Sequence, residues 1–347
     1  MAYPELNERE RRVLEAVIQS YVETAQPAGS HAIARRFGLG VSPATIRNTM
    51  SDLEEKGMLY HPHTSAGRVP TDVAYRVYVD SLIQLPATKK RERDRLTAEI
   101  ASGGSAVEAI LRRAAQSLGV ITQELGIALG PRLDDSVLEQ LDLVRLSAER
   151  ILVALTLAGG AMRTIFVEAR GEVADAALAE VTRVLNERLA GSTLRRIRTS
   201  LGERLRDSGP TGNAAELLNV FIEEGEQLFE AALHSQEDDV LLGHASVLAE
   251  QPEFANVNSM KKLVALTETR DDLANLLRKR SEVGGITISI GAEHNDPRLA
   301  NFTVVTAQYH AAGLSGVIGV IGPTRMPYEK VISLVTHTSK LITELLG

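Results

Sequence analysis

The chain has 347 residues, enough for two or three domains of roughly 100–200 residues each. Its 38 basic and 45 acidic side chains give a net charge of −7, and its 44% hydrophobic and 24% charged content is ordinary for a globular protein. The lack of cysteine excludes disulfides, thiolate metal sites and cysteine nucleophiles, and the lack of tryptophan with only 4% aromatic residues disfavours an aromatic platform for single-stranded nucleic acid.

Residues 1–85 are predicted to form a small, mostly helical unit. Its charged first residues lack the apolar stretch of a signal peptide, so we expect a cytoplasmic protein. Asn7 followed by Glu10 predicts a capping box at the start of the first helix. Ser30 is expected to cap a short second helix, and the glycines within 38–40 predict a tight turn after it.

A third helix is predicted from Ser42-Pro43 to about Lys56, because a serine N-cap followed by proline is a strong helix start. Residues 58–70 have short apolar ends around a polar, glycine-containing middle, which predicts a hairpin. Helices, tight turn and hairpin in this order are typical of a winged helix-turn-helix.

A helical wheel of the third helix separates a core face from a polar arc. Ile46, Met50 and Leu53 share the inward face. The opposite arc carries small polar side chains with an arginine and an asparagine, which can read guanine and adenine in the major groove. Serines at the helix starts, where free N–H groups favour phosphate oxygens, add to this surface. The DNA contacts predicted in this way are Ala44, Thr45, Arg47, Asn48 and Ser51 on the arc, with Ser30 and Ser42 at the helix starts.

The hairpin supplies a second set of candidates. Arg68 follows Gly67 and could enter a minor groove or meet phosphate. His61 and His63 could contact DNA or simply belong to the loop; a metal site is the third interpretation, which the lack of nearby cysteines and carboxylates disfavours. Residues 1–71 hold eight basic and eight acidic side chains, so the plain polar side of an amphipathic helix remains the alternative to DNA binding.

The rest of the chain predicts an α+β domain with an insertion. Residues 86–104 are predicted to be a linker, 105–190 the first part of the domain, 191–255 a helical insertion and 256–347 the second part. The expected strands are 127–129, 141–146, 151–157, 164–168, 286–290, 302–310 and 317–321, with a Gly159-Gly160 hairpin turn and helices at about 174–189, 258–280 and 327–346. The most apolar runs, 151–162 and 314–323, are too short to span a bilayer, so we expect no membrane contact.

Three stretches resemble the HrcA family of heat-inducible transcription repressors: PATIRNTMSDLE at 43–54, HTSAGRVPT at 63–71 and GVIGPTRMPY at 319–328. The resemblance covers nearly the whole chain and is weakest at 191–255. It implies an N-terminal winged helix, a GAF-like domain and, at 191–255, a dimerising insertion within that domain. It also implies a homodimer that binds an inverted-repeat operator upstream of chaperone genes, with the chaperonin GroEL as co-regulator.

The resemblance also bears on single residues. The family's DNA-reading segments correspond to residues 42–51 and 61–68. Together with the candidates above, they give the predicted DNA-contacting set: Ser30, Ser42, Pro43, Ala44, Thr45, Arg47, Asn48, Ser51, His63, Thr64 and Arg68.

Two other classes of function are an enzyme and a sensor of a small molecule. No phosphate-binding loop and no His-Glu-x-x-His motif occurs, and residues 313–316 only approach a nucleophile elbow, so we expect no enzyme, no cofactor and no metal. The alternative function is a GAF-type regulator that senses a small molecule. Its pocket could be lined from 286–290 and 302–305, although these residues are equally expected in a plain core.

Overall fold

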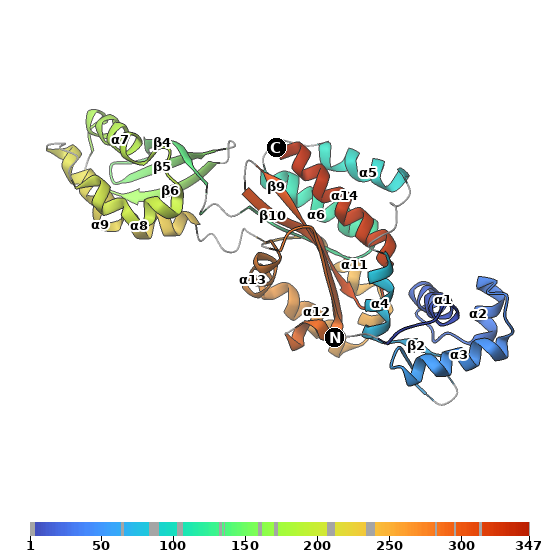
Figure 1. Ribbon diagram of the computed structural model, residues 1–347. Helices are drawn as coiled ribbons and strands as arrows, with labels where there is room; N and C mark the ends of the chain where they lie inside the picture. The colour runs from blue at the N-terminus through green and yellow to red at the C-terminus, as the bar shows by residue number, and fades with distance from the viewer. Residues whose placement is uncertain are drawn as a thin grey trace.

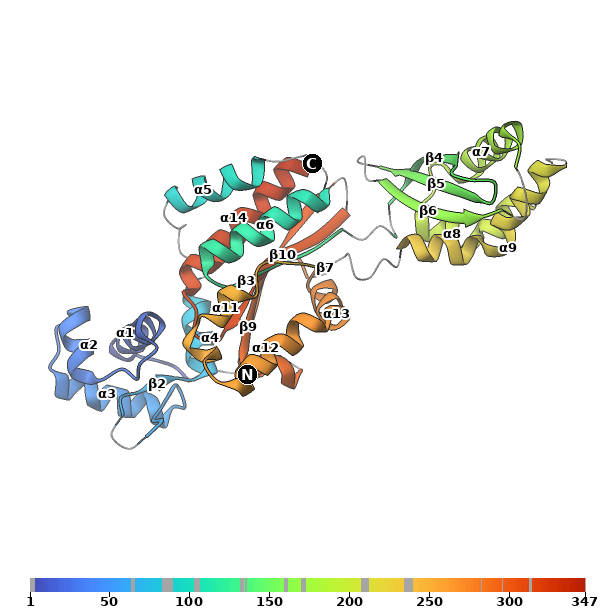
Figure 2. The same cartoon turned by 180° about the vertical axis from the view of Figure 1, so that it is seen from behind.

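The structure, a computed structural model, describes residues 4–346 apart from 64–65, 83–89, 103–106, 132–133, 135, 159–161, 170–172, 207–211, 234–239, 282, 295 and 312–313. We divide it into a head (residues 4–71), a central domain (72–131 and 240–346) and an outer unit (134–233). The head and the outer unit lie at opposite ends of the central domain (Figures 1 and 2). The protein is α+β, as predicted.

The head consists of three helices and a two-stranded antiparallel hairpin. Its elements are α1 (Glu8–Thr24), α2 (Ser30–Phe37), α3 (Pro43–Glu55), β1 (Leu59–Tyr60) and β2 (Val69–Pro70). The predicted capping box is confirmed, because the N–H groups of Glu10 and Asn7 each donate to the other's side chain over 2.9 Å. The predicted start of α3 is confirmed as well, since Ser42 Oγ accepts the Thr45 N–H at 3.1 Å.

The expected Ser30 cap is wrong. Gly29 is the N-cap of α2, with extended backbone (φ −92°, ψ 144°), and Ser30 is the first helical residue. The cause lies in the preceding residue. Ala28 exchanges two backbone hydrogen bonds with Arg68 of the hairpin, of 2.8 and 2.9 Å. This bridge holds the chain extended up to Ala28, so the helix begins only after Gly29.

The central domain is built on a five-stranded antiparallel sheet of order β7-β3-β10-β9-β8. One face packs against α6 and α14, on which α5 packs in turn, and the other face packs against α12 and α13 (Figure 1). The strands are β3 (Leu125–Leu129), β7 (Val240–Leu242), β8 (Ile286–Ile290), β9 (Phe302–Ala311) and β10 (Leu314–Pro323). The helices are α4 (Asp72–Leu82), α5 (Lys90–Ala101), α6 (Val107–Thr122), α11 (Ser246–Ala249), α12 (Val257–Glu268), α13 (Arg270–Ser281) and α14 (Tyr328–Leu346), with short turns η1 (Pro252–Phe254), η2 (Gly291–Glu293) and η3 (Pro297–Leu299).

Three predictions about this domain are corrected. The helix predicted at 258–280 is two helices, because the chain leaves helical geometry at Thr269. The linker predicted at 86–104 contains α5, whose Leu96 and Ile100 are buried in the core that α6 and α14 share, so α5 belongs to the domain. Residues 240–242, placed by the sequence in the helical insertion, form the edge strand β7.

The outer unit has a hydrophobic core of its own, formed by a three-stranded antiparallel sheet and three helices. Its elements are β4 (Leu138–Arg145), β5 (Arg150–Leu157), β6 (Met162–Glu168), α7 (Asp175–Leu189), α8 (Leu194–Leu205) and α9 (Asn213–Leu233). The predicted strands at 141–146, 151–157 and 164–168 are thus confirmed but belong to this unit. The predicted insertion, 191–255, begins too late, because β4 to α7 share the hydrophobic core of α8 and α9. It also ends too late, because residues 240–242 belong to the central sheet. The predicted Gly159-Gly160 turn lies outside the described residues.

The two ends of the outer unit return to the same point of the central sheet. Leu129, the last residue of β3, pairs with Val240, the first residue of β7. The outer unit is therefore inserted between two neighbouring antiparallel strands of the central sheet. This geometry suits an insertion into an otherwise complete sheet.

Glu124 is a buried carboxyl under the end of β10. It is 1% exposed, and it lies so close to Gly322 that a Cβ there would displace the Glu124 carboxyl. Burial raises the pKa of Glu124 well above the ordinary value of about 4.3. Its hydrogen bond from Gln251 Nε2, at 3.3 Å, offsets only part of this effect.

We expect Glu124 to make the protein less stable as pH rises. Its folded pKa lies above the unfolded one, so the folded state holds the extra proton between the two values and stability falls across that range. Glu124→Gln should unfold at a higher temperature than the wild type at pH 8, with a smaller difference near pH 4. Thermal unfolding across pH measures this, and the exposed Glu250→Gln is the control. Equal pH dependence in Glu124→Gln and wild type would contradict it.

Candidate nucleic-acid interface

The helix α3 presents the surface that the wheel predicted. Ile46, Met50 and Leu53 are buried in the core of the head, as expected, and Thr49 joins them. Thr49 is a polar residue on the inward face because its hydroxyl donates to the Thr45 carbonyl at 3.1 Å, which satisfies it within the helix. The remaining arc of α3 lies outside the core of the head.

Arg47 and Asn48 are the most accessible readers on this arc. Both are exposed, and neither side chain has a hydrogen-bond or ion-pair partner among the described residues. Ala44 beside them is exposed and small, which permits close approach to a groove. Thr45 and Ser51 are half-buried, and their hydroxyls bond within α3: Thr45 to Ser42 at 2.9 Å, and Ser51 to the Arg47 carbonyl at 3.3 Å.

Arg68 does not lie free on the hairpin. Its side chain is only 12% exposed, and Nη2 lies 2.8 Å from the Glu54 carboxylate at the end of α3. Nη1 shares a hydrogen bond of 2.7 Å with His61 Nδ1. The structure thus holds the Arg68 side chain within the head, and its contact with a minor groove or a phosphate stays a prediction. The geometry makes Arg68 a clamp that fixes the hairpin against α3.

The two histidines of the hairpin differ in their surroundings. His61 is tied to Arg68, and its Nε2 lies 3.6 Å from Glu54, whereas His63 is exposed. Thr64 lies outside the described residues. Within the described part of the chain, no group of three metal-ligating side chains gathers at this hairpin or elsewhere.

Other basic side chains of the head differ in whether they form ion pairs. Arg35 is exposed, Arg36 pairs with Glu23, and Lys56 donates to the buried Glu10. The Lys56 hydrogen bond holds the pKa of Glu10 below its usual value, so this pair serves the fold of the head.

Gly67 brings the hairpin against the loop before α2. A Cβ at this position would lie 2.4 Å from the Ala28 carbonyl oxygen and 2.5 Å from its carbon, which are backbone atoms that cannot turn aside. We expect Gly67→Ala to destabilise the protein by about 1–3 kcal/mol, because it forces the hairpin off the head. Thermal unfolding measures the loss. The control is Gly29→Ala in the facing loop, where an added Cβ meets no atom within 4 Å; a loss of the same size there would contradict the contact argument.

Arg325 anchors the head to the central domain, and Arg76 fixes η2 to α4 inside the central domain; the sequence analysis did not single out either arginine. Arg325, within the 319–328 stretch, donates to the Val22 carbonyl of α1 at 2.6 Å and binds the Glu253 carboxylate. Arg76 of α4 donates from Nε to Glu293 of η2 at 2.6 Å. The sequence signalled only Arg325, which lies in the 319–328 string. Spacing could not reveal these contacts, because Val22, Glu253 and Glu293 lie 72 to 303 positions away from their arginines in sequence.

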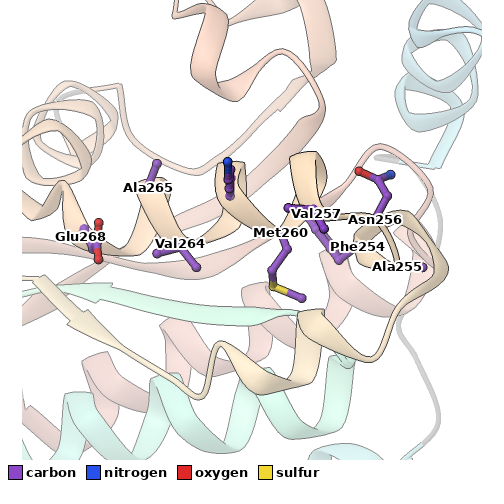
Figure 3. Close-up of a pocket in the computed structure, with 9 residues that line it drawn as sticks. Phe254, Ala255, Asn256, Val257, Met260, Val264, Ala265 and Glu268 are labelled. Atoms are coloured by element: carbon purple, nitrogen blue, oxygen red, sulfur yellow. The ribbon is translucent and has the colours of Figure 1, made fainter.

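A groove of about 560 Å³ runs along α12 (Figure 3). Phe254, Val257, Met260 and Val264 form its apolar side. Lys261 and Glu268 lie at its rim. No helix of the described residues is long and apolar enough to cross a membrane.

Comparison with known proteins gives the family. Residues 108–332, more than half of the chain, match the model of the HrcA protein C terminal domain. The chain is 37% identical to the heat-inducible transcription repressor HrcA of Geobacter sulfurreducens, over 99% of this chain and 98% of the relative. It is 38% identical to that of Chlorobium phaeobacteroides, over the full length of both. The chain belongs to the HrcA family.

The fold is also found in a crystal structure of a hypothetical protein. That structure matches with a TM-score of 0.67 and 22% identity, over 99% of each chain. The match supports the three-part arrangement as a whole. The curated members of the HrcA family named above are heat-inducible transcription repressors.

Proposed function

We propose that this HrcA-family chain represses heat-shock chaperone genes by placing α3 of a winged helix-turn-helix in the major groove of an inverted-repeat operator. The observation that carries the proposal is the pair of exposed, unpartnered side chains Arg47 and Asn48, on a helix whose other face is fully buried. Arginine and asparagine are the side chains that bind guanine and adenine bidentately. Such a protein acts on the chromosome, so we propose a cytoplasmic location with nucleoid association on the operator.

The head has the features of a preformed reading surface. Ser42 caps α3 at its start, and Arg68 ties the hairpin to Glu54 at its end. In the first turn of α3 the Ala44 N–H is left for a phosphate, because Pro43 has no N–H and Ser42 accepts the N–H groups of Thr45 and Ile46. In this proposal Ser42, Pro43 and Ala44 meet the backbone or the groove edge, while His63 at the hairpin is free to contact DNA and Arg68 positions it.

We propose that the protein is a homodimer joined through its outer unit. The helices α7, α8 and α9 cover one face of the β4-β5-β6 sheet. Val144, Leu152 and Phe166 lie side by side across the three strands on the opposite face, by the strand register. Val144 is 47% and Phe166 54% exposed. Contiguous apolar exposure on a sheet face marks an interaction surface, and a two-fold dimer matches an inverted repeat.

We propose a GAF-like role for the central domain and a GroEL-type chaperonin as co-regulator. The central sheet must pair β3 with β10 across nearly 200 residues, and the outer unit must fold between them. Such non-local pairing is slow and exposes apolar surface on the way, which makes the chain a natural client of a chaperonin. Unfolded proteins that occupy the chaperonin would then lower the competent fraction of repressor; a tenfold fall weakens apparent binding tenfold, about 1.4 kcal/mol.

A reporter experiment tests the repressor role. A chaperone promoter with its inverted repeat is placed before a reporter in a host without its own HrcA, with and without this chain. We expect lower expression with the chain and recovery after heat shock. Repression that persists when the repeat is scrambled would contradict operator recognition.

A further inference from the structure

A second cleft lies in the central domain, on the face of the sheet opposite α6 and α14. It has a volume of about 480 Å³ and is bounded by α13, by the edge strand β8 and by the turns η2 and η3. Most of the residues that line it are polar or titratable, and four leucines and Val283 add apolar surface. Nothing in the DNA-binding proposal uses it.

The floor of this cleft holds a buried arginine without a counter-ion. Arg280 is 7% exposed, and its partners are all neutral. Nη1 donates to the carbonyls of Thr287 and Val304, each at 3.2 Å, and to Thr306 Oγ1 at 3.3 Å, and Nη2 donates to Ser289 Oγ at 2.6 Å. No carboxylate of the described residues lies within ion-pair distance of it. Taking a guanidinium out of water without an anion costs several kcal/mol.

The carboxylates around the cleft are already engaged. Asp272 and Asp296 both bind Arg298, and Glu293 binds Arg76. They neutralise other arginines and leave the positive charge of Arg280 unmatched.

Further donors face the same space. Lys279, next to Arg280, is exposed, and no partner for it is recorded among the described residues. His294 lines the cleft, and its Nε2 is buried without a hydrogen-bond partner there. The Ser289 hydroxyl completes the set. A guanidinium, an ammonium, an imidazole and a hydroxyl together match the oxygens of a carboxylate or a phosphate.

We propose that this cleft is a binding site for a small anionic ligand, a carboxylate or phosphoryl compound whose charge pairs with Arg280. The anion supplies the missing counter-ion, with Lys279, Ser289 and His294 as additional contacts. The cleft is large enough for a metabolite rather than a single ion.

The site is placed to influence the head, an extension that rests on the proposed DNA-binding function. His294 directly follows η2. On its far side η2 contacts α4, where Glu293 binds Arg76 and the Ala292 N–H donates to Asp72 Oδ2 at 2.9 Å. Asp72 comes two residues after the hairpin strand β2. A ligand that shifts η2 therefore acts on the element joining the head to the central domain.

Isothermal titration of the full-length protein tests the site without DNA. The probes are malonate and inorganic phosphate, each at constant ionic strength against chloride. We expect saturable binding at one site per chain for at least one probe, and the two arms distinguish a carboxylate from a phosphate site. Absence of saturable binding for both probes would overturn the proposal, and would leave the operator-binding proposal intact.

Variants locate the binding. Arg280→Met should weaken it at least tenfold, and Lys261→Ala, which removes an exposed lysine beside the other groove, should leave it unchanged. If Arg280→Met does not fold, the Lys279→Ala/Ser289→Ala double variant takes its place, with a loss of at least threefold expected. Folded variants that bind as the wild type does would show that Arg280 only supports the sheet. Operator affinity with and without the bound probe then measures the coupling to the head.

Discussion

Arg47→Ala is expected to lose roughly 1–3 kcal/mol of operator binding per half-site and to relax base preference at one position of each. For a dimer on two half-sites this is about 2–6 kcal/mol, at least thirtyfold in Kd. The reason is its place at the centre of the exposed arc of α3, with no competing partner in the described part of the protein. Fluorescence anisotropy with duplexes varied one base pair at a time measures both effects.

Two further variants serve as controls for Arg47→Ala. Arg12→Ala removes an exposed arginine of the same head on α1 and should leave the base preference unchanged. Arg68→Ala should act differently from both: it frees Glu54 and loosens the hairpin, so binding weakens with a fall in the melting temperature. An Arg47→Ala protein with an unaltered operator preference would show that the arc reads no base.

Phe166→Glu is expected to convert the protein to monomers and to weaken operator binding by orders of magnitude. It puts a charge at the β6 end of the apolar row on the outer face of β4-β5-β6, where a two-fold contact would bury it twice. Sedimentation measures the oligomeric state, and anisotropy measures the binding. The control is Val257→Glu, an exposed apolar position in the groove of Figure 3, which should remain dimeric.

The strand register offers a second test of the same surface. Because Leu129 and Val240 pair directly, residues 132–238 can be replaced by a short Gly-Asn-type turn that joins β3 to β7 as a hairpin. The shortened chain should fold as head and central domain and behave as a monomer with weak operator binding. A deletion of 191–255, the range suggested by the sequence, would instead cut the outer core and remove β7. A shortened monomer that binds the operator as tightly as the full chain would contradict dimeric recognition.

The sequence predicted the local features of the head and missed the long-range ones. Asn7, Ser42 and the buried face of α3 are set by capping and periodicity within a few residues, so patterns reveal them. The start of α2 depends on the Ala28–Arg68 bridge, and the fate of Arg68 depends on Glu54, which reaches it only when the hairpin folds back. Neither is visible in spacing alone.

The domain boundaries failed for a related reason. Strands β3 and β4 follow each other closely in sequence, and both are predicted as strands, yet they belong to different sheets. Alternating hydrophobicity shows that a strand exists and does not show which sheet it joins. The short strand β7 has too few residues for a periodic signal, and Arg280 resembles any cation in a charged helix until its burial is known.

The most direct test of the central claim is the binding of the purified chain to an inverted repeat from upstream of a chaperone operon, against the same duplex with one half-site scrambled. The account predicts that one dimer protects both half-sites and that binding to the scrambled duplex is at least tenfold weaker. It also predicts that a GroEL-type chaperonin tightens operator binding and that an added unfolded client protein reverses this gain. Equal affinity for the intact and the scrambled duplex, with and without chaperonin, would contradict it.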